Sequence, residues 1–397
     1  MAHKVARIRA KMFSVNELIP NGSIEVVDAN SPADVQLRLR VDAGDSPFLY
    51  YFHFRTAGAR GVKCRYTLQN AAAVLKFLLP THTKLEGRWV NTGVMASYDR
   101  RDWFRIPVVE KDGQVSWEHI PERDHVYYAM FPPYSTERLL DLQSELQMSP
   151  LVRLETIGRS VKGRDMDLVT IGTAGPGKKK CWVIARQHPS EMQGGFFMEG
   201  FMRRLVDEDD PVSIALLQKA VFYIMPNMNP DGADLSLSRA NAAGVNLNRE
   251  WINPSLERSP EVKCVRDLME TIGVDFCFDA HADAQLRCNF LGGPLEIPSR
   301  SERLNTLFYS FEKSWAAASP DYELGHPYPG GSPEKADLSM AWNWIAERFD
   351  CLSILLEQPF KDTSWRQDLR RAWSPQRALR FGQSFPAAIL GVVDQLR

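Results

Sequence analysis

Residues 183–195, VIARQHPSEMQGG, run from an apolar strand-like stretch into a histidine and, three positions later, a glutamate. Pro189 restricts His188 to an extended conformation, so this histidine projects away from the helix predicted to begin near Met192. A strand, a polar turn and a helix in this order are typical of the carboxyl edge of an open α/β sheet, where such folds bind ligands. The stretch therefore predicts an α/β fold and makes His188 and Glu191 candidate metal ligands.

The His-x-x-Glu spacing does not by itself indicate a metal site, because His119 and Glu122 have the same spacing. This second pair lacks a strand-to-helix setting, and we do not expect it to bind a metal. The surroundings of such a pair decide between two ligands and two polar residues that share a turn.

From about residue 150 onward, apolar strand candidates alternate with helix candidates. Strands are predicted at 168–172, 181–185, 220–226, 274–281 and 351–358, and helices at 192–206, 260–272, 299–318 and 338–348. This alternation predicts an α/β domain with a largely parallel or mixed sheet. Polar residues follow four of the strands or lie at their ends, where a site is expected: His188, Asn227, His281 and Glu357.

The first third of the chain has a different pattern. Residues 20–132 form short alternating segments separated by Gly, Asp, Asn and Pro, which predicts an all-β sandwich. Leucines at near-helical spacing behind a Ser/Thr cap predict a helix within 134–148. We therefore expect an N-terminal β-sandwich domain at 1–132, a linker helix at 133–150 and an α/β domain at 151–397.

Composition excludes several classes of function. The 397 residues carry a net charge of -1 with both signs mixed, so nucleic acid is not an expected partner. No apolar run approaches the ~18 residues of a membrane span, and residues 1–9 lack the apolar core of a secretory signal. Six scattered cysteines without a Cys-x-x-Cys pair suit buried thiols in a reducing compartment. We expect a cytoplasmic protein; the sequence does not indicate its oligomeric state.

Catalytic zinc commonly takes two neutral imidazoles and one carboxylate and leaves a fourth position for water. His188, Glu191 and His281 supply that set, which predicts one Zn²⁺ per chain. Asp279 and Asp283 are candidate acceptors for the other nitrogen of His281.

A general base must lie near the metal without binding it. Glu357 fits this role because it is the one ionisable group at the end of an apolar run, where burial would raise its pKa. A second set of candidates lies in the loop 225–251. Arg249 suits a carboxylate, with Asn248 beside it as a neutral donor, and Arg239 is a further cation. A charged donor aimed at an oxyanion would contribute about 3 to 4 kcal/mol of transition-state stabilisation.

Five motifs in this order resemble those of the zinc metallocarboxypeptidase family: HPSE (188–191), NMNPDG (227–232), SRANAAGVNLNREW (238–251), FDAH (278–281) and SILLEQPF (353–360). Two stretches of the front domain, 50–70 and 127–135, resemble the β-sandwich of the cytosolic carboxypeptidase branch. The resemblance covers roughly residues 20 to 375 and is that of a bacterial-type member.

The resemblance implies a role for each candidate. His188, Glu191 and His281 would be the zinc ligands and Glu357 the general base. Arg239 would polarise the scissile carbonyl, and Asn248 and Arg249 would hold the terminal carboxylate of the substrate. The implied activity is hydrolysis of the last peptide bond of a peptide or protein tail, with glutamate or another acidic residue as an expected product.

Some features depart from the family pattern. Ala282, Asp283, Ala284 and Gln285 follow the third ligand where cytosolic members have Gly-His-Ser, which leaves the substrate side chain open. A family tyrosine ahead of the base corresponds to Tyr322 or Tyr328, in PDYELGHPYPGG (320–331), although a packing role is the commoner reading of such a residue. Arg287 and Lys335 are candidates for a basic side-chain pocket, but a solvated surface role is favoured for each.

Two other functions remain open. The same zinc site would serve an amidohydrolase that cleaves an N-acyl amino acid or a cell-wall peptide. A catalytically silent peptide-binding protein is disfavoured, because a decayed site should have lost a ligand, the base or an arginine. An amidated substrate separates release of a C-terminal residue from other hydrolyses.

Overall fold

A computed structural model describes residues 12–42, 48–73, 89, 92–328 and 334–397. Residues 1–9, on which the prediction about a secretory signal rests, and the end of the stretch 320–331 lie outside the described residues. The chain forms two compact units. Unit 1 comprises Met1–Arg40 and Phe52–Met130, and unit 2 comprises Val41–Tyr51 and Phe131–Arg397.

Unit 1 contains two five-stranded sheets, with strand orders β1-β4-β10-β6-β7 and β2-β3-β5-β9-β8. The bounds of its described strands are β1 Ser14–Asn16, β2 Glu25–Asp28, β3 Val35–Arg38, β4 His53–Ala57, β5 Cys64–Leu68, β6 Val94–Ser97, β7 Trp103–Ile106, β8 Val109–Lys111, β9 Gln114–His119 and β10 His125–Ala129. Apart from the parallel pair β3 and β5, neighbouring strands in these two sheets are antiparallel.

Aromatic side chains from both sheets of unit 1 meet in its core. Tyr66 of one sheet lies with its ring centroid 4.9 Å from that of Tyr128 in the other, and Trp117 stacks on Tyr66 at 5.2 Å. Two sheets packed through their inner faces form the predicted sandwich. His119 contacts the hydroxyls of Tyr128 and Tyr98 at 2.8 and 3.3 Å, so this histidine contributes to the packing of unit 1.

Unit 2 is an α/β unit. Its described helices are α1 Thr136–Leu146, α2 Gln193–Leu205, α3 Pro211–Lys219, α4 Pro230–Asp234, η2 Leu247–Arg249, α5 Pro260–Ile272, α6 Glu302–Ala318, α7 Ala341–Phe349, α8 Pro375–Leu390 and η3 Val393–Gln395. Its described strands are β11 Val152–Arg159, β12 Asp165–Ile171, β13 Lys179–Ala185, β14 Ala220–Met225, β15 Phe276–Asp283, β16 Phe290–Gly292 and β17 Leu352–Pro359. The described helices include none long and apolar enough to cross a membrane.

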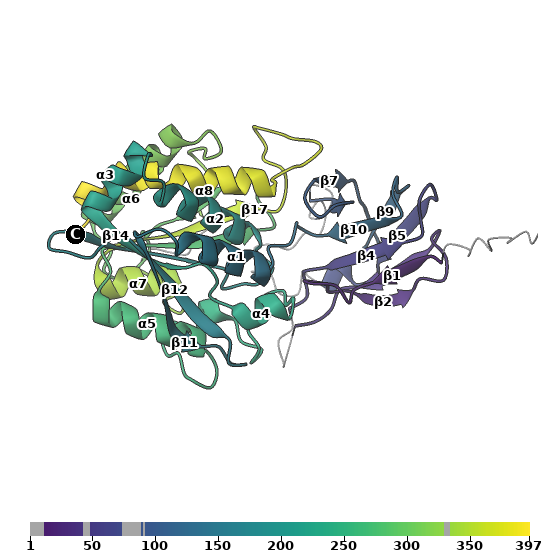
Figure 1. Ribbon diagram of the computed structural model, residues 1–397, viewed down its shortest axis with the longest axis horizontal. Coiled ribbons are helices and arrows are strands. Elements are labelled where there is room, and N and C mark those ends of the chain that lie inside the picture. Colours follow the sequence, from purple (N-terminus) through teal and green to yellow (C-terminus); the bar gives the residue numbers. More distant parts are fainter. Residues whose placement is uncertain (1–11, 43–47, 74–88, 90–91, 329–333) are drawn as a thin grey trace, which may run out of the picture. The chain divides into compact units, whose positions relative to one another are not determined.

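The seven strands of unit 2 form one mixed sheet in the order β11-β12-β14-β13-β15-β17-β16. The central strands β14, β13, β15 and β17 are parallel, and β12, β11 and β16 are antiparallel to their neighbours. Figure 1 shows α2, α6 and α8 along one face of this sheet and α5 and α7 along the other. Helices on both faces explain why the central strands are continuous apolar runs, and the arrangement confirms the predicted mixed α/β fold.

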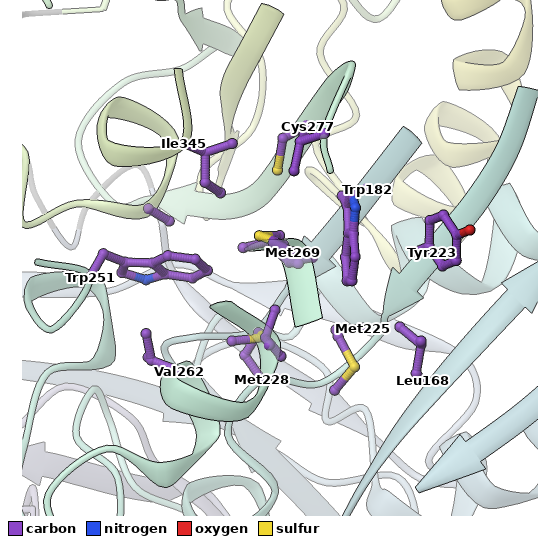
Figure 2. Close-up of a cluster of buried hydrophobic side chains, with 14 of the residues drawn as sticks. Leu168, Trp182, Tyr223, Met225, Met228, Trp251, Val262, Met269, Cys277 and Ile345 are labelled. Atoms are coloured by element: carbon purple, nitrogen blue, oxygen red, sulfur yellow. The ribbon is translucent and has the colours of Figure 1, made fainter. Parts of the chain in front are cut away.

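One hydrophobic cluster fills the space between the sheet and helices α5 and α7. Figure 2 shows Trp182 and Trp251 on either side of Met269, with Trp182 stacked on Tyr223 at 5.0 Å between ring centroids. Val262 of α5 and Met269 belong to the same cluster, as their spacing along one helical face requires. Trp251 also donates from Nε1 to the Gln187 side chain at 2.9 Å, which connects this core to the turn after β13.

Candidate metal centre and active site

The turn between β13 and α2 holds its shape through a buried arginine. Arg186 follows the strand in the left-handed region, with φ of 59°. The residue is fully buried. Its guanidinium donates to the carbonyl oxygens of Tyr134 at 3.1 Å and Pro189 at 2.9 Å. These hydrogen bonds stabilise the turn in which His188 and Glu191 lie, just beyond the end of β13.

The three predicted metal ligands converge. Nδ1 of His188 lies 2.7 Å from Oε1 of Glu191, and Nδ1 of His281 lies 2.8 Å from Oε2 of the same carboxylate. The two Nδ1 atoms are 3.2 Å apart, and all three residues are at most 5% exposed. One ligand atom from each residue lies within 4.8 Å of the others. Two imidazoles and one carboxylate are a donor set that suits zinc, so the residues fit this ion.

Each imidazole is oriented through its other nitrogen. Nε2 of His281 lies 3.0 Å from Oδ2 of Asp279, and Nε2 of His188 lies 3.0 Å from Oδ1 of Asn246. Such contacts leave the Nδ1 atoms directed at a metal. Asp279 is one of the two acceptors considered from the sequence. The other, Asp283, accepts instead from the backbone N–H of Gln285 at 2.6 Å.

Sequence reasoning missed two contributors to this arrangement. Asn246 lies two positions before Asn248 in an asparagine-rich stretch, a local signal that was available. Gln187 directly precedes His188 and donates to Asp279 at 2.7 Å while accepting from Trp251. In the sequence, only its position next to His188 indicates that Gln187 contributes to the site.

The surroundings of Glu191 and His188 shift the pKa of each group. Burial opposes ionisation of Glu191, but the adjacent imidazoles of His188 and His281 outweigh it and hold the pKa of this carboxyl below its usual range. Burial, assisted by the charge of Arg239, lowers the pKa of His188 to about 3. His188 is therefore neutral, as a zinc ligand must be. At His281, burial is instead outweighed by the charges of Asp279 and Glu191, which raise its pKa, so a zinc ion would have to displace a proton there.

Glu357 lies on the strand next to His281. The two residues are partners in the parallel pairing of β15 and β17, so both extend from the same edge of the sheet. Burial first, and then the negative charge of Glu191, raise the pKa of Glu357 well above its usual range. Its Oε2 atom has no hydrogen-bond partner among the described residues. A carboxyl with a raised pKa holds a proton more readily than an ordinary glutamate, which suits proton transfer.

The structure brings the loop candidates to the same site. Nη1 of Arg239 lies 4.0 Å from Glu191. Asn248 is buried, with Nδ2 3.5 Å from Nε2 of His281 and Oδ1 accepting from the Ala341 N–H at 2.9 Å. Arg249 lies beside it, with Nε 3.4 Å from Asp337, and burial followed by the charge of Arg239 lowers its pKa.

The remaining candidates separate into two groups. Tyr322 donates to Glu312 and stacks on Trp315, so it is a packing residue. Tyr328 lies close enough to Glu357 for the charge of this glutamate, after burial, to raise the pKa of the tyrosine.

The two candidates for a basic pocket are not brought into the metal cluster. Arg287 donates to the carbonyl of Asp362 at 3.1 Å, and Lys335 is exposed. The surface reading of Lys335 therefore agrees with its environment.

Comparison with known proteins gives a consistent result. Residues 141–362 match the zinc carboxypeptidase family, and residues 15–131 match the cytosolic carboxypeptidase N-terminal domain. A metallo-carboxypeptidase from Burkholderia cenocepacia is 41% identical, with a TM-score of 0.89 over 96% of this chain and 99% of that chain. A metallo-carboxypeptidase from Pseudomonas aeruginosa, solved in complex with (2-guanidinoethylmercapto)succinic acid, is 36% identical, with a TM-score of 0.91 over 97% of this chain and 100% of that chain. Cytosolic carboxypeptidase 6 of Caenorhabditis elegans is 25% identical over 86% of this chain and 77% of that protein.

Proposed function

The chain belongs to the zinc carboxypeptidase family, and from this premise we propose that it removes the carboxyl-terminal residue of peptides or protein tails at the site around His281. Members of this family are zinc metallocarboxypeptidases, which are hydrolases. The observation that carries the proposal is the convergence of two Nδ1 atoms and one carboxylate next to Glu357, the glutamate with a raised pKa.

His188, Glu191 and His281 are the residues that would hold the zinc ion. An ion bound there would supply Lewis acidity, polarising a carbonyl and lowering the pKa of water. Asp279 and Asn246 keep the two imidazoles in the orientation that this requires, through contacts of 3.0 Å each.

Glu357 is the proposed general base. Its Oε2 atom takes a proton from the attacking water and returns the proton to the nitrogen of the leaving amine, so the carboxyl ends the cycle as it began. Arg239 donates to the oxygen on which negative charge develops. A charged donor in this position stabilises the transition state more than the substrate.

Asn248 and Arg249 are the proposed partners of the substrate's terminal carboxylate. The planar guanidinium matches a carboxylate with two parallel hydrogen bonds. Asp337 pairs with Arg249 at 3.4 Å, and the substrate carboxylate would have to displace it. Tyr328, near both Glu357 and Arg249, is the better placed of the two tyrosine candidates to contact the substrate.

For the released residue we propose an acidic side chain, on the resemblance to cytosolic carboxypeptidases. A basic residue is the alternative, and two observations favour it. The ligand named with the Pseudomonas aeruginosa protein combines a guanidine with two carboxyl groups. In this chain, Asp283 lies close enough for its charge to contribute, after burial and Glu191, to the raised pKa of Glu357.

We further propose a cytoplasmic location and the domain division 1–132, 133–150 and 151–397. The six cysteines are all unpaired, which supports a reducing compartment.

Mass spectrometry of a matched peptide panel tests the proposed function. The peptides differ only in their last residue, which is Glu, Leu or Arg, and each is made with a free and an amidated C-terminus. The zinc-loaded protein should release one residue from free peptides only. Glu357→Gln with the same zinc content should lower kcat by about 10²-fold or more, as expected for loss of a general base.

Three outcomes of this panel would contradict parts of the proposal. Equal cleavage of free and amidated peptides would point to the amidohydrolase alternative, in which the terminal carboxylate is not recognised. Preferential release of Arg over Glu would overturn the acidic preference and leave the carboxypeptidase activity standing. Unchanged kcat in the Glu357 variant would remove this residue from the mechanism.

A further inference from the structure

A short segment between β3 and β4 belongs to the catalytic unit, although its neighbours in the sequence are strands of unit 1. This segment, Val41–Tyr51, is grouped with Phe131–Arg397 in unit 2. Asp42, at its start, is 7% exposed and accepts hydrogen bonds from three consecutive backbone N–H groups, those of Ser238 at 2.6 Å, Arg239 at 2.7 Å and Ala240 at 2.8 Å. The middle one belongs to the proposed oxyanion arginine.

The end of the same segment makes a second set of contacts with this loop. The backbone N–H groups of Tyr50 and Tyr51 both donate to Oγ of Ser238, at 2.8 and 3.2 Å. The ring of Phe48 lies under Arg239, with the guanidinium carbon 5.5 Å from the ring centroid. The segment therefore contacts both the backbone and the side chain at this point of the loop.

The opposite side of the loop contacts the metal turn. Ser190, between the candidate ligands His188 and Glu191, donates from Oγ to the carbonyl of Ser238 at 2.5 Å. The loop 238–240 is thus held between Asp42 and the turn that carries two of the ligands. A displacement of the loop would move Arg239 relative to the metal site.

The orientation of the Arg239 side chain depends mainly on the position of its backbone. Its described side-chain contacts are Glu191 at 4.0 Å, a distance too long for a hydrogen bond, and the face of Phe48. The side chain is 34% exposed. By contrast, a buried carboxylate that accepts three backbone N–H groups holds those groups firmly, because charge-assisted hydrogen bonds are short and strong.

We propose that Asp42 is a positioning residue for the reaction: it fixes the backbone of 238–240 and thereby aims the Arg239 guanidinium at the oxygen that becomes charged. The segment 41–51 then supplies part of the catalytic apparatus from a stretch that matches the N-terminal domain. The inference rests on the proposed role of Arg239.

Asp42→Asn in the full-length, zinc-loaded protein is the central variant. Asn keeps the shape of the side chain, but it loses the charge and replaces one acceptor oxygen with a donor, so the three N–H groups cannot all be satisfied. Small misplacement of a catalytic group costs about 10²-fold in rate, so kcat should fall by roughly 10- to 100-fold. KM should change by less than about threefold and zinc content should stay at one ion per chain, because neither the Arg249 contact nor the ligands are altered.

A double-mutant cycle separates positioning from general destabilisation. If Asp42 acts through Arg239, Asp42→Asn should cause no further loss of kcat in an Arg239→Ala background. The matched control is Asp210→Asn, which removes another carboxylate that accepts a backbone N–H, that of Ser213 at the start of α3. The control should lower the melting temperature and leave kcat unchanged.

A second variant keeps the test decisive if Asp42→Asn fails to fold. Ser238→Ala removes the hydroxyl that accepts from Tyr50 and Tyr51 and that also hydrogen-bonds Asp42, but it leaves the Asp42 carboxylate and its backbone N–H partners in place. It should lower kcat in the same direction, by a smaller factor, and only when Arg239 is present. A wild-type kcat in this folded variant would then overturn the inference.

The remaining outcomes distinguish a failure of the positioning role of Asp42 from a failure of the proposed role of Arg239. Wild-type kcat in Asp42→Asn, while Arg239→Ala is impaired, would overturn the positioning role alone. Losses that multiply in the double variant would do the same. Wild-type kcat in Arg239→Ala would remove Arg239 from the proposed mechanism and the inference with it.

Discussion

Two glutamates of one site show how environment assigns roles to identical side chains. Glu191 lies between two imidazoles, which hold its pKa below the usual range. Glu357 is raised well above that range, first by burial and then by the charge of Glu191. One carboxylate therefore stays ionised and suits a metal ligand, whereas the other exchanges a proton and suits a general base.

Arg249 allows a direct test at the residue scale. Arg249→Ala should raise KM for peptides with a free C-terminus by about 10-fold or more, the loss expected for a hydrogen bond to a charged group. It should also abolish the difference between free and amidated peptides. Steady-state kinetics on the matched pair measures both. Arg258→Ala, which removes an exposed arginine paired with Glu250, is the control and should change neither quantity. A retained preference for the free acid would exclude Arg249 as the carboxylate partner.

His53 in unit 1 predicts a pH dependence of stability. It is fully buried, with Nδ1 donating to the Tyr128 carbonyl at 2.9 Å, and burial lowers its pKa from 6.5 to about 4. Above pH 6.5 the group is neutral in both states. As the pH falls from about 6.5 to about 4, the unfolded state binds a proton that the folded state does not. The free energy of unfolding should therefore fall by up to about 3 kcal/mol over this window.

His53→Asn tests this because Asn keeps a donor for the Tyr128 carbonyl and does not titrate. Denaturant midpoints at about pH 7.5 and about pH 5 should differ less in the variant than in the wild type. His125→Asn, at an exposed position of β10, should behave like the wild type. Equal pH dependence in His53→Asn and the wild type would show that the folded state protonates His53 readily.

The candidate site could be predicted from the sequence as far as local patterns reach. His188, Glu191, His281 and Glu357 each follow or end an apolar strand, and parallel strands bring such positions to one edge of a sheet. Asp42 had no local signal, because its partner Ser238 is 196 positions away. Contacts of this length depend on tertiary structure and leave no periodicity in the sequence.

At the scale of elements, the strongly periodic segments were predictable. The helices expected at 192–206 and 260–272 correspond to α2 and α5, at Gln193–Leu205 and Pro260–Ile272. Helix α8 was not predicted. Gly382 and Pro386 interrupt its pattern, and both residue types are poor helix formers. Packing against α2 explains why the helix forms nevertheless, since tertiary contacts override weak propensity.

The crossing of α2 and α8 depends on two glycines. A Cβ added to Gly382 would lie 2.0 Å from the Phe197 carbonyl oxygen, and one added to Gly200 would lie 1.9 Å from that of Leu379. Gly382→Ala should therefore lower the free energy of unfolding by about 1 to 3 kcal/mol or prevent folding, as overpacking does. Calorimetry measures this. Gly175→Ala, in a loop with nothing within 4 Å of the added atom, is the control. A wild-type melting temperature in Gly382→Ala would show that the helices can move apart.

At the scale of the whole molecule, the division of the chain does not follow the sequence continuously. The segment Val41–Tyr51 belongs to unit 2, while strands β3 and β4 on either side belong to unit 1. Composition and alternation show where a β-rich region ends, but they do not reveal an excursion of eleven residues. The predicted boundaries at 132 and 150 remain predictions.

Removal of zinc should affect stability as well as activity. An ion that binds the folded state alone stabilises it by about 2.7 kcal/mol at a hundredfold excess over Kd. A strong chelator should therefore lower the melting temperature of the protein, and added zinc should restore it. His281→Ala should melt at a temperature that neither reagent changes. If the chelator left the melting temperature of the wild-type protein unchanged, a zinc site that includes His281 would be contradicted.

The most direct test of the account is a crystal structure of the zinc-loaded protein with anomalous diffraction recorded at the zinc absorption edge. We predict one anomalous peak per chain, in contact with Nδ1 of His188, Nδ1 of His281 and the carboxylate of Glu191, with Glu357 nearby and outside the ligand set. A peak elsewhere in the chain, a peak bound through Nε2 atoms or through Glu357, or no peak at full zinc loading would contradict the proposed centre.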